Sequence, residues 1–264
     1  TQLFELRTGR GGPTPPPARL RFRGGAAVVA ARKIRECRAE VVAIRWPRPE
    51  VIEVDLRMIE PPELDFEAGQ WISVPFGPKI VRAWSMLSSP TRKRTITLAV
   101  DVAPGGMGSQ WLRALKLGDP VEFKGPTGGF VFNRADPRRA VFVAEEIGIV
   151  PVRSILADLY ETGYGRQTIL IYWARDPSWL LYDAEFRSLA RRYPGFTYVA
   201  SVREAPAGWR GEAGEAAAAV DRLVHSVDKL VVYVCGGGDT VNAVRDALVK
   251  KGMDRKSVKW EKFW

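Results

Sequence analysis

The chain has 264 residues, and its 46% hydrophobic content is sufficient for two cores at roughly 150 residues per domain. Forty Lys and Arg residues against 30 Asp and Glu residues give a net charge of +10, which favours acidic partners. The two cysteines, Cys37 and Cys235, exclude a disulfide framework and a four-thiolate iron–sulfur or zinc site within the chain. The sequence shows neither an apolar run of membrane-spanning length nor a signal-peptide pattern, so we expect a cytoplasmic protein.

Residues 1–25 form a predicted N-terminal arm that is rich in Pro, Gly and Arg. This stretch has too little apolar surface to build a core of its own. We expect the arm to dock on a partner or to pack along the domain that follows.

Residues 26–135 predict a small antiparallel β-barrel, because short apolar runs alternate with Gly- and Pro-containing turns. Residues 136–264 instead alternate apolar strands with amphipathic helices, which predicts a doubly wound parallel sheet. The helix expected near residues 183–193 places Phe186, Leu189, Ala190 and Tyr193 on one face. Such sheets bind ligands at the carboxyl ends of their strands, where residues 144–151 and 235–240 are expected to lie.

Two segments of the predicted barrel suggest a diphosphate site: "RAWSMLSSP" at residues 82–90 and "GGMGSQWL" at residues 105–112. Arg82 is a fixed cation beside an aromatic residue, and the glycines allow backbone to approach an anion at the start of a short helix. A diphosphate that carries a flat ring would fit both segments. The structural alternative is that Trp84 is core, Ser85 is a turn hydroxyl and the glycines form a loop.

These segments resemble the ferredoxin–NADP⁺ reductase-like flavoproteins. The family's Arg-x-Tyr-Ser pattern is matched by residues 82–85, its Gly-Gln-aromatic strand by residues 69–71, its Gly-x-x-Ser turn by residues 105–109 and its Gly-Pro-x-Gly-x-Phe segment by residues 125–130. The resemblance continues through "YWARDPSWLLYDAEF", "CGGGDTVNAVRDAL" and the C-terminal "WEKFW", and it covers about residues 34–264.

The resemblance implies bound FAD, with FMN as the less expected cofactor, and hydride transfer between nicotinamide C4 and flavin N5. It implies catalytic roles for Ser85, Cys235 and Glu261. In the family's pattern, Arg82 and the Gly108–Ser109 turn hold the diphosphate, Trp84 replaces the usual Tyr against the isoalloxazine, and Phe263 covers its other face. The full set of implied flavin-binding residues is Arg82, Ala83, Trp84, Ser85, Gly106, Met107, Gly108, Ser109, Phe263 and Trp264.

The nucleotide turn departs from the family, because Glu145 and Glu146 stand where relatives usually have Gly-Gly. Their charges could repel a diphosphate, accept hydrogen bonds from ribose, or occupy the anion position at the N-terminus of the helix that follows. Arg175, Arg203 and Arg210 match the region where NADPH-using relatives place arginines, or they are solvated surface residues. The implied nucleotide-binding residues are Glu145, Glu146, Gly148, Arg175, Arg203, Arg210, Cys235, Gly236 and Gly237.

The favoured function is electron transfer between NAD(P)H and an acidic carrier such as ferredoxin or flavodoxin. The alternative is a flavin-bearing electron-transfer subunit with weak or no direct NAD(P)H binding. Nucleic-acid binding is disfavoured, because the basic residues form short scattered runs. The single histidine, His225, is expected in a helical stretch and suggests no metal site.

Overall fold

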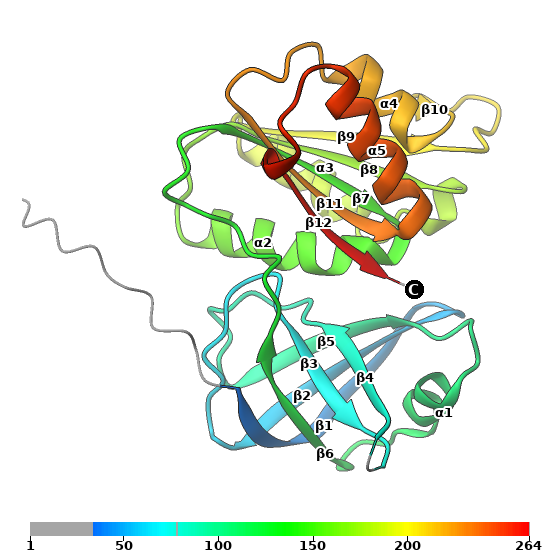
Figure 1. Cartoon of the computed structure of the whole chain (residues 1–264). Helices are drawn as coiled ribbons and strands as arrows, with labels where there is room; N and C mark the ends of the chain where they lie inside the picture. Colours follow the sequence, from blue (N-terminus) through cyan, green and yellow to red (C-terminus); the bar gives the residue numbers. More distant parts are fainter. Residues whose placement is uncertain (1–33, 78, 264) are drawn as a thin grey trace, which may run out of the picture. The chain divides into compact units, whose positions relative to one another are not determined.

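The computed structural model describes residues 34–77 and 79–263 (Figure 1). The predicted arm at residues 1–25, the first residues of the predicted barrel and Trp264 lie outside the described residues. Within the described ranges, no helix is both long enough and apolar enough to cross a membrane.

Six antiparallel strands form the first sheet, in the order β4-β3-β6-β1-β2-β5. Met86 follows β4 and pairs with Leu98 of β5, which joins the two edges of the sheet into a barrel. The predicted antiparallel barrel is therefore confirmed. Its strands are β1 (Arg35–Arg48), β2 (Val51–Glu60), β3 (Trp71–Pro75), β4 (Val81–Ser85), β5 (Thr95–Asp101) and β6 (Pro120–Thr127).

Alternating side chains fill the barrel, as the period of a strand requires. In β6, Val121 and Phe123 are buried while Glu122 and Lys124 are exposed. The helix α1 (Met107–Ala114) follows β5 and buries Leu112 in the same core. The N-terminal end of α1 remains open to solvent beside β4.

The second sheet has six parallel strands in the order β10-β9-β8-β7-β11-β12. The predicted parallel fold is confirmed, and the short strand β10 is an addition that the sequence pattern did not indicate. Its strands are β7 (Arg139–Glu145), β8 (Thr168–Ala174), β9 (Phe196–Val202), β10 (Glu212–Ala213), β11 (Leu230–Gly237) and β12 (Val258–Phe263).

Helices cover both faces of this sheet, as Figure 1 shows. One core lies under α2 (Ile149–Glu161) and α3 (Asp183–Arg192), and the other lies under α4 (Ala216–Leu223) and α5 (Gly238–Lys250). The predicted apolar face of α3 is confirmed, because Phe186 is buried and its neighbours on that face pack against the same core. Short 3₁₀ turns complete the fold: η1 (Glu146–Gly148), η2 (Pro177–Trp179) and η3 (Arg255–Ser257).

The neighbouring strands β7 and β11 define the point where the strand order reverses. From β7 the chain adds β8 and β9 on one side, and it then returns to place β11 on the other side. Ligands of doubly wound sheets bind in the crevice at the carboxyl ends of such a pair. Cys235 pairs with Ala144 there, so the two segments predicted to lie at this edge are adjacent.

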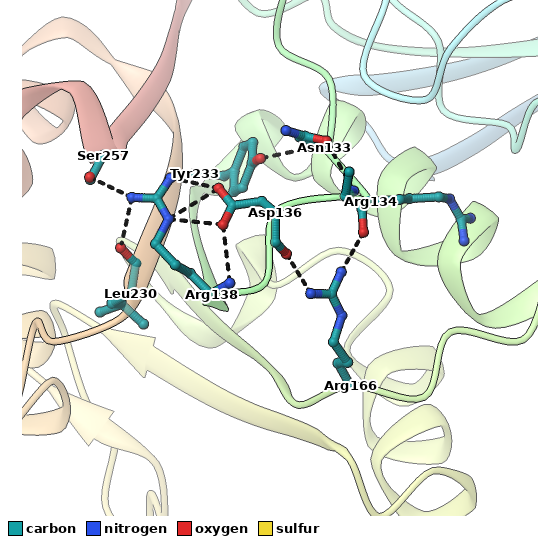
Figure 2. A network of polar contacts seen from close by, with 9 residues as sticks. Asn133, Arg134, Asp136, Arg138, Arg166, Leu230, Tyr233 and Ser257 are labelled. Carbon is teal, nitrogen blue, oxygen red and sulfur yellow. Dashed lines mark hydrogen bonds and ion pairs between the residues drawn. The ribbon is translucent and has the colours of Figure 1, made fainter. Parts of the chain in front are cut away.

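The segment between β6 and β7 is fastened by a polar network (Figure 2). Asp136 accepts hydrogen bonds from the backbone N–H, Nε and Nη2 of Arg138, and Arg138 Nη1 donates to Ser257 Oγ at 2.6 Å. On the other side of the segment, Arg166 donates to the carbonyl oxygens of Arg134 and Asp136. Two arginines thereby tie residues 134–138 to the parallel sheet and to the turn η3.

Candidate active site

The predicted diphosphate site lies at the N-terminus of α1, beside Arg82. The helix has Gly106 as its N-cap, with no side-chain cap and no acidic residue in its first turn. A Cβ on buried Gly108 would lie 3.0 Å from the Trp84 ring and 3.2 Å from Arg82 Cγ, so glycine is needed for this close approach. Arg82 is exposed, and its guanidinium donates a hydrogen bond to the carbonyl oxygen of the preceding residue, Val81. The N-terminal residues of α1 and the Arg82 side chain therefore lie next to each other.

These features fit a diphosphate. A helix N-terminus offers unpaired N–H groups and a positive dipole end, and an arginine adds charge-assisted hydrogen bonds. Exposed Gly106 and Met107 stand at the mouth of this site, and half-buried Ser109 follows them in the first turn. Ala83 is exposed on β4 between Arg82 and the aromatic residue.

Trp84 belongs to an aromatic cluster that the sequence interpretation missed. Its ring is stacked on that of Trp111, with centroids 5.8 Å apart and planes 10° apart, and Phe76 packs edge-on at 6.1 Å. Trp111 lies within the quoted segment at residues 105–112, one turn from Gly108. The pairing could have been sought from helical periodicity, because residues 108 and 111 share a face.

The predicted catalytic residues lie where the barrel meets the parallel sheet. Ser85 Oγ of β4 donates a hydrogen bond to Glu261 Oε1 of β12 at 3.2 Å. Glu261 pairs in register with Cys235 of β11. Burial raises the pKa of the Glu261 carboxyl to about 7, against a smaller lowering by the Ser85 hydroxyl. Burial, with the nearby Glu261 and Glu145 carboxylates, raises the pKa of the Cys235 thiol well above its ordinary value, so Cys235 is a neutral thiol.

Glu145 ends β7, and its side chain reaches the carboxyl end of β11. Its Oε2 accepts a hydrogen bond from the backbone N–H of Gly237, the N-cap of α5, at 2.6 Å. A Cβ on Gly236 would lie 2.7 Å from that oxygen, so the carboxylate is packed directly against the glycine turn. Burial raises the pKa of Glu145, while Gly237 and Thr240 hydrogen bonds oppose the shift. The carboxylate occupies the N-terminus of α5, whereas the sequence interpretation had considered the helix that follows the turn, which is α2.

Glu146 adopts a left-handed backbone conformation, with φ 45°, and is buried. Its Oε1 accepts hydrogen bonds from the backbone N–H and Nε of Arg175, and its Oε2 accepts one from Arg175 Nη2 at 2.6 Å. Gly148 follows in η1, where a Cβ would lie 2.4 Å from the Cys235 carbonyl oxygen. The two predicted nucleotide segments are thus in contact, and side chains of the protein itself occupy the polar positions between them.

The remaining predicted residues lie at the edges of this region. Arg203 pairs with Glu215, Arg210 is exposed, and Phe263 is half-buried against the core next to Gly237 in register. The expectation for His225 was wrong, because it follows the C-terminus of α4 in an exposed irregular segment and does not lie within a helix. Among the described residues, no group of His, Cys, Asp and Glu side chains could hold a metal ion.

Comparison with known proteins agrees with this geometry. Residues 50–132 match the family model of an oxidoreductase FAD-binding domain, and residues 142–246 match that of an oxidoreductase NAD-binding domain. The chain is 29% identical to ferredoxin–NADP reductase B of Sorangium cellulosum over 235 residues, which are 85% of this chain and 96% of that protein. It is 30% identical to reductase component 1 of terephthalate 1,2-dioxygenase from Comamonas sp. over 81% of this chain, but it spans only 64% of that relative.

Solved structures give the same result. The Amycolatopsis cytochrome P450 reductase GcoB superposes with a TM-score of 0.79 at 26% identity, over 87% of this chain and 70% of that protein. A ferredoxin NADP⁺ reductase from Neisseria gonorrhoeae shares the fold with a TM-score of 0.74 at 19% identity, over 87% and 99% of the two chains. Fold and site together define a flavin-dependent oxidoreductase. The chain belongs to the ferredoxin–NADP⁺ reductase-like family of flavoprotein reductases.

Proposed function

We propose that this protein passes electrons between NAD(P)H and a protein carrier through a bound FAD. The observation that carries the proposal is the hydrogen bond between Ser85 and Glu261, because it brings the FAD-binding half and the NAD-binding half together at one point. That point lies at the carboxyl end of the parallel sheet, where a doubly wound fold binds its ligand.

In this proposal Arg82 and the N-terminus of α1 hold the flavin diphosphate. Trp84 and Phe263 lie against the two faces of the flavin ring. A bound flavin would supply the hydride acceptor and the route for electrons to the next carrier. Ser85 places its hydroxyl at the reacting position, and the protonated carboxyl of Glu261 lies next to that hydroxyl. Cys235 contributes a small neutral side chain that leaves room for the nicotinamide. The residues contribute mainly by positioning.

The acceptor is proposed to be an acidic carrier such as ferredoxin or flavodoxin. The net charge of +10 supports an acidic partner, and the relatives are named as a ferredoxin reductase and as reductase components of oxygenases. A cytoplasmic location is part of the same proposal, because both cysteines are free and NAD(P)H is an intracellular reductant.

One observation favours a second candidate, a flavin-bearing electron-transfer subunit that binds NAD(P)H weakly. Glu145 sits in the crevice at the strand reversal, so an incoming diphosphate must displace a carboxylate that α5 already holds. Relatives named as oxygenase reductase components are compatible with either candidate.

Anaerobic mixing of the purified holoenzyme with NADH or NADPH separates the two candidates. Rapid bleaching of the flavin absorbance by either nucleotide supports the reductase. Bleaching by a reduced protein carrier, together with none by either nucleotide at millimolar concentration, would support the electron-transfer subunit. Mass measurement of the released cofactor identifies FAD or FMN in the same preparation.

A further inference from the structure

Arg175, which follows the carboxyl end of β8, already has a carboxylate partner. Both carboxylate oxygens of Glu146 accept hydrogen bonds from the Arg175 guanidinium. One of these oxygens also accepts a hydrogen bond from the backbone N–H of Arg175. The Glu146 side chain is only 10% exposed, whereas Arg175 is 52% exposed. The pair is therefore a buried anion that fixes a cation at the rim of the crevice.

A second contact holds the same guanidinium in place. It lies 4.4 Å from the centroid of the Trp179 ring, and Arg48 of β1 lies over that ring at 4.3 Å. Arg48 also donates to the carbonyl oxygen of Ser178. Turning Arg175 toward a ligand would break the bidentate pair and the cation–π contact together, so its present orientation is strongly preferred.

The next arginine along this edge is also paired. Arg203 follows β9, donates from Nε and Nη2 to the two carboxylate oxygens of Glu215, and lies 4.9 Å from the centroid of the Trp173 ring. Glu215 is 63% exposed, so this pair is weaker than the first. Arg210 is exposed, and water and salt screen a single exposed cation. Of the two carboxylates that pair with these arginines, Glu146 is therefore the better buried.

This edge is where a doubly wound sheet reads the adenosine ribose. An acidic side chain suits a free 2′-hydroxyl, and an unpaired arginine suits a 2′-phosphate. A phosphate dianion approaching Arg175 would also approach the buried Glu146 carboxylate, which cancels much of the attraction. A nucleotide with free ribose hydroxyls meets no such repulsion.

We infer that Glu146 is a specificity-determining residue that makes this protein select NADH over NADPH. The inference rests on the proposed function, because it names the nucleotide that the proposed reductase uses. It assigns to Glu146 a role through Arg175, whose charge it neutralises.

The test compares 5′-ADP with 2′,5′-ADP, which differ in the 2′-phosphate, by calorimetry on the holoenzyme. We expect the wild-type protein to bind 5′-ADP at least about threefold more tightly than 2′,5′-ADP, and Glu146→Gln to tighten 2′,5′-ADP about tenfold while 5′-ADP changes less than about threefold. Glu185→Gln, which removes the partner of Arg153 in the same half of the chain, is the matched control and should leave the ratio unchanged.

Three results would overturn the inference: binding of 2′,5′-ADP as tight as or tighter than that of 5′-ADP in the wild type, equal tightening of both by Glu146→Gln, or no change in the variant's ratio. If the variant does not fold, the wild-type ratio still decides. Flavin bleaching distinguishes failure of the inference from failure of the proposed function. Faster bleaching by NADPH contradicts the inference alone, whereas no bleaching by either nucleotide contradicts the proposed function and the inference with it.

Discussion

Glu261 has a carboxyl whose pKa lies near neutral pH. Its pKa of about 7 results from burial, and the Ser85 hydroxyl, which favours the charged form, lowers it less than burial raises it. The carboxyl is protonated below that value and charged above it. Under the proposed function, a negative charge on Glu261 opposes hydride transfer, because the transfer brings negative charge to the same site.

We therefore predict that the rate of flavin reduction by pyridine nucleotide falls as the pH rises through about 7. Glu261→Gln should remove this dependence, since the amide cannot ionise and still accepts the Ser85 hydrogen bond. Stopped-flow absorbance from about pH 5.5 to about pH 8.5 measures both profiles. Glu204→Gln, at an exposed position in the same half, is the control. The same transition near pH 7 in Glu261→Gln would assign it to another group.

A second prediction concerns the Glu145 carboxylate. Glu145→Ala removes the carboxylate that occupies the N-terminus of α5, so nucleotide binding should tighten about tenfold, since one repulsive charge is removed from the crevice. The helix loses its cap, which should lower the free energy of unfolding by about 1 kcal/mol. Calorimetry with NADH and urea unfolding measure the two effects. Weaker nucleotide binding in the variant would mean that Glu145 accepts a ribose hydroxyl.

At the scale of elements, α1 and β4 form the predicted diphosphate site, and its charge comes from Arg82. Arg82→Ala should leave the barrel folded and weaken flavin binding by at least about tenfold, because the proposed charge-assisted contact with the diphosphate is lost. Fluorescence of flavin released on dilution measures the loss, with circular dichroism as the check on folding. Arg92→Ala, an exposed arginine on the same barrel, is the control. Full flavin retention in Arg82→Ala would move the diphosphate site elsewhere.

The elements themselves were largely predictable, because each depends on local periodicity. Alternation in β6 and the helical spacing around Phe186 indicated the strand and the helix directly. Contacts between distant residues were not predictable in this way. The bond from Gly237 to Glu145 joins positions 92 residues apart, and it depends on β7 and β11 being neighbours. The position of His225 was missed because α4 ends at Leu223, two residues earlier.

At the scale of the whole molecule, side chains of the barrel and of the parallel sheet meet in several hydrogen bonds. Ser154 of α2 donates to the carbonyl oxygen of Ser88, and the Tyr182 hydroxyl donates to Glu53 of β2 at 2.6 Å. The Ser85–Glu261 bond belongs to the same set. The candidate active site therefore depends on both halves being folded. A change that loosens the segment between them should lower stability without touching the reacting groups.

Asp136 offers that test, because the network of Figure 2 is centred on it. Arg138 is the main cause that lowers the pKa of Asp136 from 3.8 to about 2. A carboxyl whose pKa is lowered on folding stabilises the folded state above its unfolded pKa, and this stabilisation is lost as the pH falls from about 3.8 through about 2. The shift corresponds to about 2 kcal/mol at neutral pH.

Asp136→Asn should therefore lower the free energy of unfolding by about 2 kcal/mol at pH 7, measured by urea unfolding. The variant should also lose less stability than the wild type between about pH 4 and about pH 2, because it has no carboxyl at this position. Glu63→Gln, which breaks the exposed pair with Arg94, is the matched control and should cost less than about 0.5 kcal/mol. Equal losses in the two variants would show that the network adds nothing beyond a surface ion pair, and the segment would then be held by Arg166 through main-chain carbonyls alone.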